Sequence, residues 1–325
     1  MASLLWNTFH LGVSSREFEA QSRVDLLERN TRVGIRVWNW QGLGEIRLRG
    51  GVQGCGGQRA SVVWQRRAVG EVESSGGKRN CECYDQYDVR VPYVDAWQWQ
   101  KLRVGEKVAM LGREEDFDDT LIILQHPPVY TLGTRSTEAN LKFDVNDPSF
   151  ELHRTERGGE VTYHGPGQLV MYPILNLRHH KMDLHWYLRT LEEVVIGALD
   201  KACGIQAHRI DGLTGVWVDN QKVAAVGVRV TRWITYHGVA LNVTTDLTPF
   251  SNIIPCGISD YSVTSVAKIL ENSCESRLEM NPEGLLKLLH DCLLAEFEEK
   301  FNVHLVPPSQ PGPEPVSKAS VLELV

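Results

Sequence analysis

Apolar residues in this chain follow a helical spacing in some segments and a strand-like spacing in others, and this mixture constrains the fold more than any other feature. The strongest helical pattern starts at Asp183, a residue type that caps helix N-termini, and stops at Gly204, a type that follows helix C-termini. Its apolar stripe consists of Leu184, Tyr187, Leu188, Leu191, Val194, Val195, Ala198 and Leu199.

Two further helices are predicted, one with Asp95 as its N-cap and one opened by Asn281 and Pro282. The first would have Trp97, Val104, Val108 and Leu111 on one face, and the second Leu285, Leu289, Cys292, Leu293 and Phe297.

The predicted strands are short and lie between these helices. Residues Thr120–Leu124 form an apolar run, and Val216–Val218 and Val223–Val230 flank a polar turn, which predicts a β-hairpin. Strands and helices therefore mix without strict alternation. This order favours an α+β domain, with a mixed, largely antiparallel sheet and packed helices, over a doubly wound fold.

The first 80 residues differ in composition from the rest. They carry 11 arginines and one lysine against seven acidic residues, and ten glycines lie between Gly42 and Gly77. Such a segment buries too little apolar surface to offset its ordering entropy, so residues 1–80 are expected to be a largely disordered leader. A basic, Arg-rich leader is typical of an organelle transit peptide, although seven acidic residues are more than such peptides usually carry. An extension without a targeting role is the alternative.

The globular body is expected over residues 81–306, and five prolines between Pro307 and Pro315 predict a flexible tail over 307–325. The net charge of the whole chain is −7 and the leader is basic, so the body is acidic. An acidic body argues against nucleic-acid binding, which needs a basic face. No apolar run approaches the roughly 18 residues that a transmembrane helix needs.

The seven cysteines are an odd number spread over a long chain, which favours reduced thiols over a disulfide framework. Cys203 and Cys292 are expected to be small core residues. Cys81 and Cys83 form a pair with no matching second pair or histidine cluster, so no metal site is expected.

The densest group of unusual residues is the segment 157–168, which holds four glycines, a proline, an arginine and a histidine. Gly158 and Gly159 would let a ligand approach the backbone closely, beside the polar side chains of Arg157 and His164. A glycine-rich loop without function is equally compatible with this composition. The segment is not a phosphate loop, because the Gly-x-x-x-x-Gly-Lys-Ser/Thr spacing is absent.

Two further segments contain reactive side chains. Lys222 begins an otherwise apolar strand of small residues, where a solvated strand edge is the ordinary explanation for a lysine. Cys256 stands between Pro255 and Gly257. Proline fixes the backbone before the cysteine and glycine permits an unusual conformation after it, so this turn is expected to present a thiol instead of burying it.

Taken together, these segments resemble the lipoyl (octanoyl) transferase family, most closely the plastid type of plants. The resemblance covers about residues 81–303 and is close along Arg157–Leu177, Gly215–Val243 and Ile254–Gly257, with support from His126–Gly133. It implies a fold similar to that of biotin and lipoate protein ligases, a location in the plastid with the mitochondrion as the alternative, and no cofactor.

The resemblance also implies a two-step reaction on a cysteine thioester. Cys256 would take an octanoyl group from octanoyl-acyl carrier protein, activated by Lys222. The acceptors would be the lysines of lipoyl domains in 2-oxoacid dehydrogenase acyltransferase subunits and of the glycine cleavage H protein. The residues expected to bind the substrate are Arg157, Gly158, Gly159, Glu160, Val161, Thr162, Tyr163, His164, Ala225, Val226, Gly227, Gly238, Val239 and Ala240.

Elementary chemistry supports this pairing. A free thiol is only a few per cent thiolate at pH 7, and a neighbouring ammonium lowers the pKa of the thiol. Three alternatives stay open: an ATP-dependent lipoate or biotin ligase, which needs no cysteine nucleophile; a thiol hydrolase, for which His164 or His237 would serve as base; and a non-catalytic binder of carrier or lipoyl domains.

Overall fold

The computed structural model describes residues 77–254, 262–272 and 281–312 in full, and three N-terminal strands by their backbone alone. The chain divides into two compact units, Met1–Glu71 and Val72–Val325. Each unit is described by itself. Among the described residues, no helix is long and apolar enough to cross a membrane.

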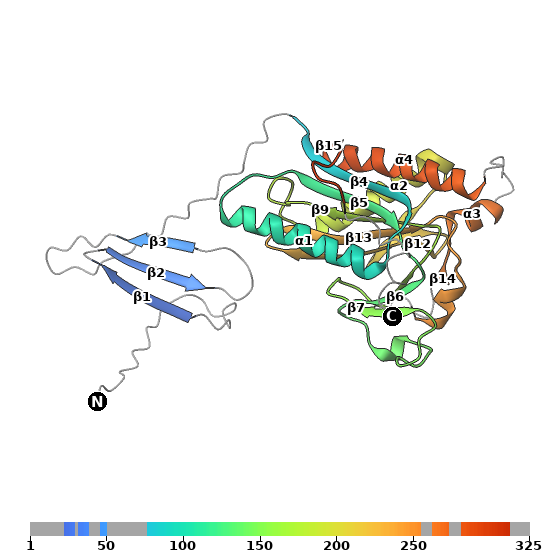
Figure 1. Cartoon of the computed structure of the whole chain (residues 1–325), viewed down its shortest axis with the longest axis horizontal. Coiled ribbons are helices and arrows are strands. Elements are labelled where there is room, and N and C mark those ends of the chain that lie inside the picture. The colour runs from blue at the N-terminus through green and yellow to red at the C-terminus, as the bar shows by residue number, and fades with distance from the viewer. Residues whose placement is uncertain are drawn as a thin grey trace, which may run out of the picture. The chain divides into compact units, whose positions relative to one another are not determined.

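The first unit contains a three-stranded antiparallel sheet of β1 (Arg23–Arg29), β2 (Arg32–Trp38) and β3 (Ile46–Gly50), in that order (Figure 1). These strands lie within residues 1–80, which the sequence predicts to be a largely disordered leader. In β2, Val33, Ile35 and Val37 alternate with other residues at the period of a strand. The rest of the predicted leader up to residue 76 lies outside the described residues, and its role as a transit peptide stays a prediction.

The second unit is built on one nine-stranded sheet. Its strands are β4 (Arg79–Arg90), β5 (Asp119–Gln125), β9 (Gln168–Ile174), β10 (His208–Ile210), β11 (Leu213–Val218), β12 (Gln221–Thr231), β13 (Ile234–Asn242), β14 (Ser262–Val263) and β15 (Val303–Val306). The order is β10-β11-β12-β13-β9-β5-β4-β15, and β14 pairs with β12.

All neighbours from β10 to β5 in this order are antiparallel, whereas β4 is parallel to both β5 and β15, and β14 is parallel to β12. The predicted α+β class with a mixed, largely antiparallel sheet is therefore confirmed. The predicted hairpin is β11–β12, whose turn residues Asp219 and Asn220 both have positive φ. Two successive left-handed residues match the right-handed twist of hairpin strands.

Helices cover both faces of this sheet (Figure 1). α2 (Leu184–Cys203) and α4 (Pro282–Phe301) pack against one face, where Leu121, Met171 and Leu241 belong to the largest core cluster. α1 (Tyr93–Gly112) covers the other face and packs with Ile122 and Val170. A sheet with both faces covered has no solvated side, which explains the fully buried strands β5, β9 and β13.

The predicted ends of two helices are confirmed. The Asp183 side chain accepts a hydrogen bond from the N–H of Trp186, and Gly204 ends α2 with φ 65°. Asn281 caps α4 in the same way, through the N–H of Gly284 at 2.7 Å, with Pro282 in its first turn. Each cap provides an acceptor for an N–H that has no partner within the helix.

The prediction for α1 was wrong in two details. Its N-cap is Pro92, which has extended φ and ψ angles, and Asp95 lies inside the first turn. Its buried face includes Trp99, whereas Trp97 is half-buried and donates to Glu156 at 3.2 Å. The two tryptophans are two positions apart, about 200° around a helix, so they lie on different sides of α1.

A smaller layer of structure completes the body. A second sheet, in the order β7-β6-β8, consists of β6 (Val129–Leu132), β7 (Glu151–Arg154) and β8 (Thr162–His164). The remaining elements are η1 (Glu138–Asn140), η2 (Thr248–Asn252) and α3 (Val266–Asn272). The described start of the predicted tail, 307–312, contacts the body, because the N–H of Ser309 donates to Glu82; residues 313–325 lie outside the described residues.

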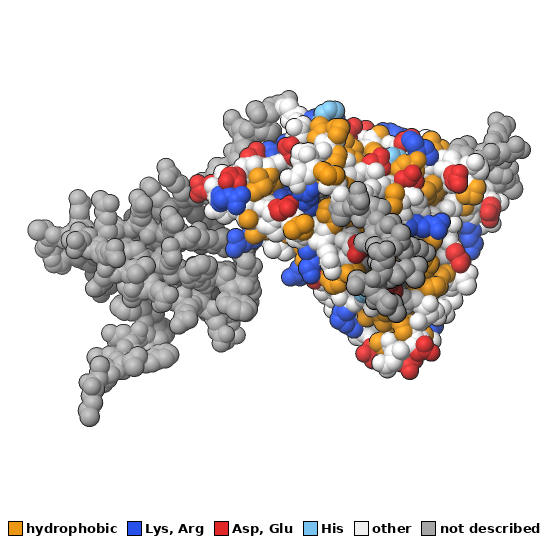
Figure 2. Space-filling view, in the orientation of Figure 1, with side chains coloured by type: hydrophobic (Ala, Val, Ile, Leu, Met, Phe, Trp, Pro, Cys, Tyr) orange, Lys and Arg blue, Asp and Glu red, His pale blue; other side chains and the backbone are white. Residues whose placement is uncertain are grey.

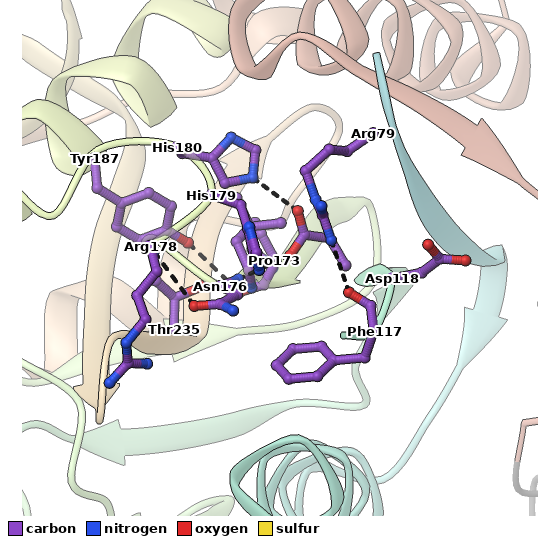
Figure 3. Close-up of polar contacts among 12 residues, drawn as sticks. Arg79, Phe117, Asp118, Pro173, Asn176, Arg178, His179, His180, Tyr187 and Thr235 are labelled. Atoms are coloured by element: carbon purple, nitrogen blue, oxygen red, sulfur yellow. Dashed lines mark hydrogen bonds and ion pairs between the residues drawn. The ribbon is translucent and has the colours of Figure 1, made fainter. Parts of the chain in front are cut away.

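A polar cluster fixes the connection that leads from β9 to α2 (Figure 3). Asp119 is fully buried; one of its carboxylate oxygens accepts the N–H of Asn176 at 2.8 Å and the other lies 2.7 Å from Nε2 of His180. Arg79 closes the cluster by donating to the carbonyl of Phe117 at 3.0 Å. The connection ends at Asp183, the N-cap of α2, three residues after His180.

Candidate active site

A cavity of about 410 Å³ lies between β12, β13, β9, the segment 157–162 and the start of α2. Hydrophobic, basic and acidic side chains alternate over the face of the body in Figure 2, so this surface does not by itself point to a site. Thirteen of the fourteen predicted substrate-binding residues line the cavity: Arg157, Gly158, Gly159, Glu160, Val161, Thr162, His164, Ala225, Val226, Gly227, Gly238, Val239 and Ala240. Lys222 lines it as well.

Tyr163 is the predicted residue that does not line the cavity. Its side chain is buried in a separate apolar cluster, with ring centroids 5.6 Å from Tyr130 and 5.5 Å from Phe250. Residues alternate between the two faces of a strand, and β8 directs its neighbours Thr162 and His164 to the cavity instead.

Small residues on paired strands leave the space that forms the cavity. Gly227 is the register partner of Gly238, and Ala225 is that of Ala240. A Cβ atom at Gly227 would lie 2.9 Å from the carbonyl oxygen of Gly158, and one at Gly238 would lie 2.1 Å from that of Met171. The two glycines therefore let neighbouring backbone segments approach closely, which a larger residue would prevent.

The loop that carries Arg157 is attached to β12 and to β6. The N–H of Gly158 donates to the carbonyl of Val228 at 2.9 Å. The buried guanidinium of Arg157 donates to Thr131 through three contacts, at 2.7 Å to its carbonyl and at 2.9 and 3.3 Å to its hydroxyl. Arg157 is thus a fixed part of the cavity wall, not a mobile surface cation.

A hydrogen-bond network defines the protonation state of His164. Nε2 of Gln168 donates to Oδ1 of Asn242 at 2.8 Å, so Oε1 of Gln168 accepts from Nδ1 of His164 at 2.7 Å. Nε2 of His164 lies 3.3 Å from the hydroxyl of Thr131, which can donate to it. Burial lowers the pKa of His164 well below its usual value, and the positive charge of Arg157 lowers it further. His164 is therefore neutral at pH 7.

Two more histidines lie near this network and are also neutral. Burial lowers the pKa of His126 to about 4, although its hydrogen bond to the carbonyl of Val91 opposes the shift. Burial lowers the pKa of His237 to about 3, with a further contribution from Arg157. His237 lines the cavity with φ 57°, and neither ring nitrogen has a hydrogen-bond partner within the described chain.

Lys222 is buried on the opposite part of the cavity wall. It lies on β12 six residues before Val228, the register partner of His237, which corresponds to about 20 Å along a strand. Its Nζ donates to the carbonyl of Thr214 at 3.0 Å and lies 4.6 Å from the centroid of the Trp217 ring. Lys222 is only 7% exposed, so the explanation as a solvated strand edge is wrong.

Cys256, with Pro255 and Gly257, lies outside the described residues, so its distance from Lys222 stays a prediction. The described chain resumes at Ser262, which pairs with Gln221, and Val263 pairs with Lys222. All four thiols that are described have raised pKa values because of burial, which raises the pKa of Cys83 to about 12 and that of Cys203 to about 11. Cys203 and Cys292 pack against the core cluster, as predicted. Within residues 77–254, 262–272 and 281–312, no cluster of His, Cys, Asp or Glu could hold a metal ion.

The cavity also contains residues that the sequence analysis missed. Leu184 and Leu188 were expected in the core stripe of α2 but line the cavity, and Leu184 is 42% exposed. The cavity extends over the first turns of α2, where Leu184 and Leu188 line it, whereas Tyr187 of the same stripe is buried in the core cluster. Tyr172 and Asn242 also line the cavity. They lie on largely apolar strands, so nothing in the sequence indicated that their side chains reach a site.

Comparisons with known proteins agree on one family. Residues 94–280 match the model of the lipoyl protein ligase A/B catalytic domain. The octanoyltransferase LIP2p2 (chloroplastic) of Arabidopsis thaliana is 57% identical over 227 residues, which cover 70% of this chain and 81% of that protein. An octanoyltransferase of Synechocystis sp. is 56% identical over 213 residues, which cover 66% of this chain and 87% of that protein.

The fold comparison is consistent with this result. A crystal structure of a lipoate-protein ligase A bound with ATP superposes with a TM-score of 0.52 and 16% identity, and covers 71% of this chain and 88% of that chain. At this identity the likeness concerns the fold alone. The predicted similarity to the lipoate protein ligase fold is confirmed.

Proposed function

The chain belongs to the lipoyl protein ligase A/B catalytic domain family and is an octanoyltransferase, and from this premise we propose the route by which it transfers the acyl group. The donor is octanoyl-acyl carrier protein. The acceptors are the lysines of lipoyl domains in 2-oxoacid dehydrogenase acyltransferase subunits and of the glycine cleavage H protein. The product is an octanoylated lysine, the substrate for completing protein-bound lipoate.

The first step forms an acyl-enzyme on Cys256. The Cys256 thiolate attacks the thioester carbonyl of the donor; a C–S bond to Cys256 forms, the C–S bond to the carrier breaks, and the carrier thiolate takes up a proton from Lys222. In the second step the acceptor amine attacks the acyl-enzyme, an amide C–N bond forms, and the Cys256 thiolate leaves. Lys222 receives the proton that the amine loses.

The observation that carries this proposal is a buried lysine on the wall of a cavity lined by small and apolar side chains. A lysine in such a place can hold an ammonium beside a thiolate in a site that excludes most water, where the attraction between the two charges is stronger than in solution. Val226 and Val239 give the same cavity walls suited to a saturated chain. The cavity needs no cofactor for this chemistry.

The hydrolase alternative needs a histidine base for the thiol. His237 is a poor candidate, because burial lowers its pKa to about 3 and a base this weak does not take a proton from a thiol near pH 7. His164 has the same defect, since burial also lowers its pKa, and its Nδ1 already donates to Gln168. These observations favour Lys222 as the partner of the nucleophile.

The test is the Cys256→Ser variant. After incubation with octanoyl-acyl carrier protein, intact mass spectrometry of the wild-type protein should show one added octanoyl group, and peptide mapping should locate it on Cys256. The variant should show no adduct and should lose octanoyl transfer by at least about a thousandfold. Wild-type transfer by Cys256→Ser would exclude this route, and a requirement for ATP would favour the ligase alternative.

A plastid location is part of this proposal. The 57% identical relative of Arabidopsis thaliana is named chloroplastic, and the basic composition of residues 1–80 suits a transit peptide. Import of the full chain into isolated plastids, compared with isolated mitochondria, tests this location.

A further inference from the structure

A buried glutamate, Glu192, is connected to Lys222 through one peptide group. Glu192 is on α2 and is fully buried, and its Oε1 accepts the N–H of Gly215 at 2.9 Å. Its Oε2 lies 2.8 Å from Nη1 of Arg189 and 3.1 Å from Nε of Arg209. A buried carboxylate is stable only when it is paired and hydrogen-bonded, and Glu192 meets both conditions.

The peptide group that Glu192 holds is the one that holds Lys222. The N–H of Gly215 and the carbonyl of Thr214 belong to the same planar peptide unit, so fixing one end fixes the direction of the other. That carbonyl accepts the hydrogen bond from Nζ of Lys222 at 3.0 Å. One peptide plane therefore connects the buried carboxylate to the ammonium.

Gly215 has the backbone conformation that this arrangement requires. Its φ is 131°, which side chains of L-residues rarely allow. A Cβ atom at this position would also lie 2.8 Å from the carbonyl oxygen of Ala224 and 3.0 Å from Cε of Lys222. The lysine stem thus passes directly over the glycine.

We propose that Glu192 is a positioning residue for Lys222, acting through the Thr214–Gly215 peptide. This inference rests on the proposed function, in which Lys222 activates Cys256. The carboxylate polarises the peptide and makes the Thr214 carbonyl a stronger acceptor, which strengthens the hydrogen bond that holds Nζ of Lys222 in one place. An ammonium held in place stabilises the thiolate of Cys256.

Glu192→Gln tests the role of the charge, and Glu193→Gln is its matched control. Glutamine keeps an oxygen that can accept the N–H of Gly215, so the fold should be retained. Glu193 is the next residue on α2, is half-exposed and also pairs with Arg209. The same chemical change there removes a surface charge without touching the Thr214–Gly215 peptide.

The pH profile of Cys256 alkylation by iodoacetamide is the main readout, because it reports thiolate formation without any acyl substrate. For Glu192→Gln we expect the thiol pKa to rise by about one unit, which leaves about one-tenth of the thiolate at pH 7. Acyl-enzyme formation should slow about tenfold at pH 7 and recover at a pH above the new pKa. Glu193→Gln should match the wild-type protein in both measurements.

Recovery at high pH separates positioning from structural damage. A Glu192→Gln variant that matches Glu193→Gln in both measurements would overturn the proposal, and so would one that is slow at every pH with a lowered melting temperature. Gly215→Ala provides a second approach, since it displaces the same peptide while leaving Glu192 in place, and it should raise the thiol pKa as well. If Cys256→Ser still transfers octanoyl groups, the proposed route itself fails, whatever the result at Glu192.

Discussion

His237 and Lys222 line the same cavity, but the two side chains differ in the polar groups around them. Among the described residues, His164 bonds only to Thr131 and Gln168 and the His237 ring has no hydrogen-bond partner, and burial keeps both histidines neutral by lowering their pKa values. Lys222 is equally buried, but its nitrogen lies on a carbonyl backed by the carboxylate of Glu192. Burial disfavours a positive charge on the two histidines, whereas the ammonium that the proposed route assigns to Lys222 has a carbonyl acceptor that the fold holds in place.

Removing the lysine should produce the largest change. Lys222→Met keeps the length and apolar stem of the side chain but removes the amine. This part of the cavity wall then has no basic group at position 222. We expect acyl-enzyme formation to slow by about a thousandfold at pH 7, since general acid–base catalysis contributes about 10²–10⁴. Single-turnover kinetics with octanoyl-acyl carrier protein measure this rate.

Lys287→Met is the control for that variant, because Lys287 is an exposed residue whose ion pair with Asp291 contributes little to stability. A Lys222→Met rate within tenfold of that control would mean that the two parts of the wall do not differ in function.

The histidines should give the next largest effect, on stability instead of catalysis. Unfolded histidine titrates near pH 6.5, whereas the folded pKa values of His126 and His237 are about 4 and about 3. Below pH 6.5 the unfolded chain therefore binds protons that the folded chain does not. The free energy of unfolding then decreases as the pH is lowered. Each of these histidines should lower the free energy of unfolding by about 2 kcal/mol when the pH is reduced from 7 to 5.

Urea unfolding at both pH values measures this loss. His237→Asn cannot titrate, and asparagine tolerates the left-handed backbone at this position. The variant should lose about 2 kcal/mol less than the wild-type protein over the same interval. Equal losses would show that His237 is not held neutral by burial.

The smallest effect is expected at a thiol without a lysine beside it. Burial raises the pKa of Cys203 to about 11, so this thiol should react with iodoacetamide at pH 7 far more slowly than Cys256. Cys203→Ser should keep octanoyl transfer within about twofold of the wild-type rate, because Cys203 packs against the core away from the cavity lining. A larger loss in a steady-state transfer assay would give Cys203 a role that the cavity does not suggest.

Local chemistry explains which parts of the fold could be predicted from the sequence. Asp183 and Gly204 act through backbone groups within a few residues, and the helix between them has the ends that these residues indicate. Asp219 and Asn220 form the hairpin turn for the same reason. The start of α1 was predicted wrongly because Asp95 is a preferred N-cap type, yet the helix begins earlier, after Pro92, which makes no side-chain cap.

The arrangement of the site depends on contacts between distant segments, which the sequence does not reveal. Gln168 reaches Asn242 across 74 positions, and Glu192 reaches Gly215 from a helix that sequence spacing assigned to packing alone. The resemblance to the family identified Lys222 and the cavity residues, but it carried no information about the groups behind them. Tyr163 illustrates the opposite error, since it belongs to the family motif yet its side chain faces an apolar cluster.

The parallel pairing of β15 with β4 has a consequence for how the protein is made. β4 opens the body and β15 closes it, and more than 200 residues of sequence separate the two strands. During synthesis on the ribosome, this edge of β4 stays unpaired until β15 has emerged, when nearly the whole chain has been made. Pro307 and Pro308 follow β15 directly and have no N–H to donate, so the strand pairing cannot continue through them.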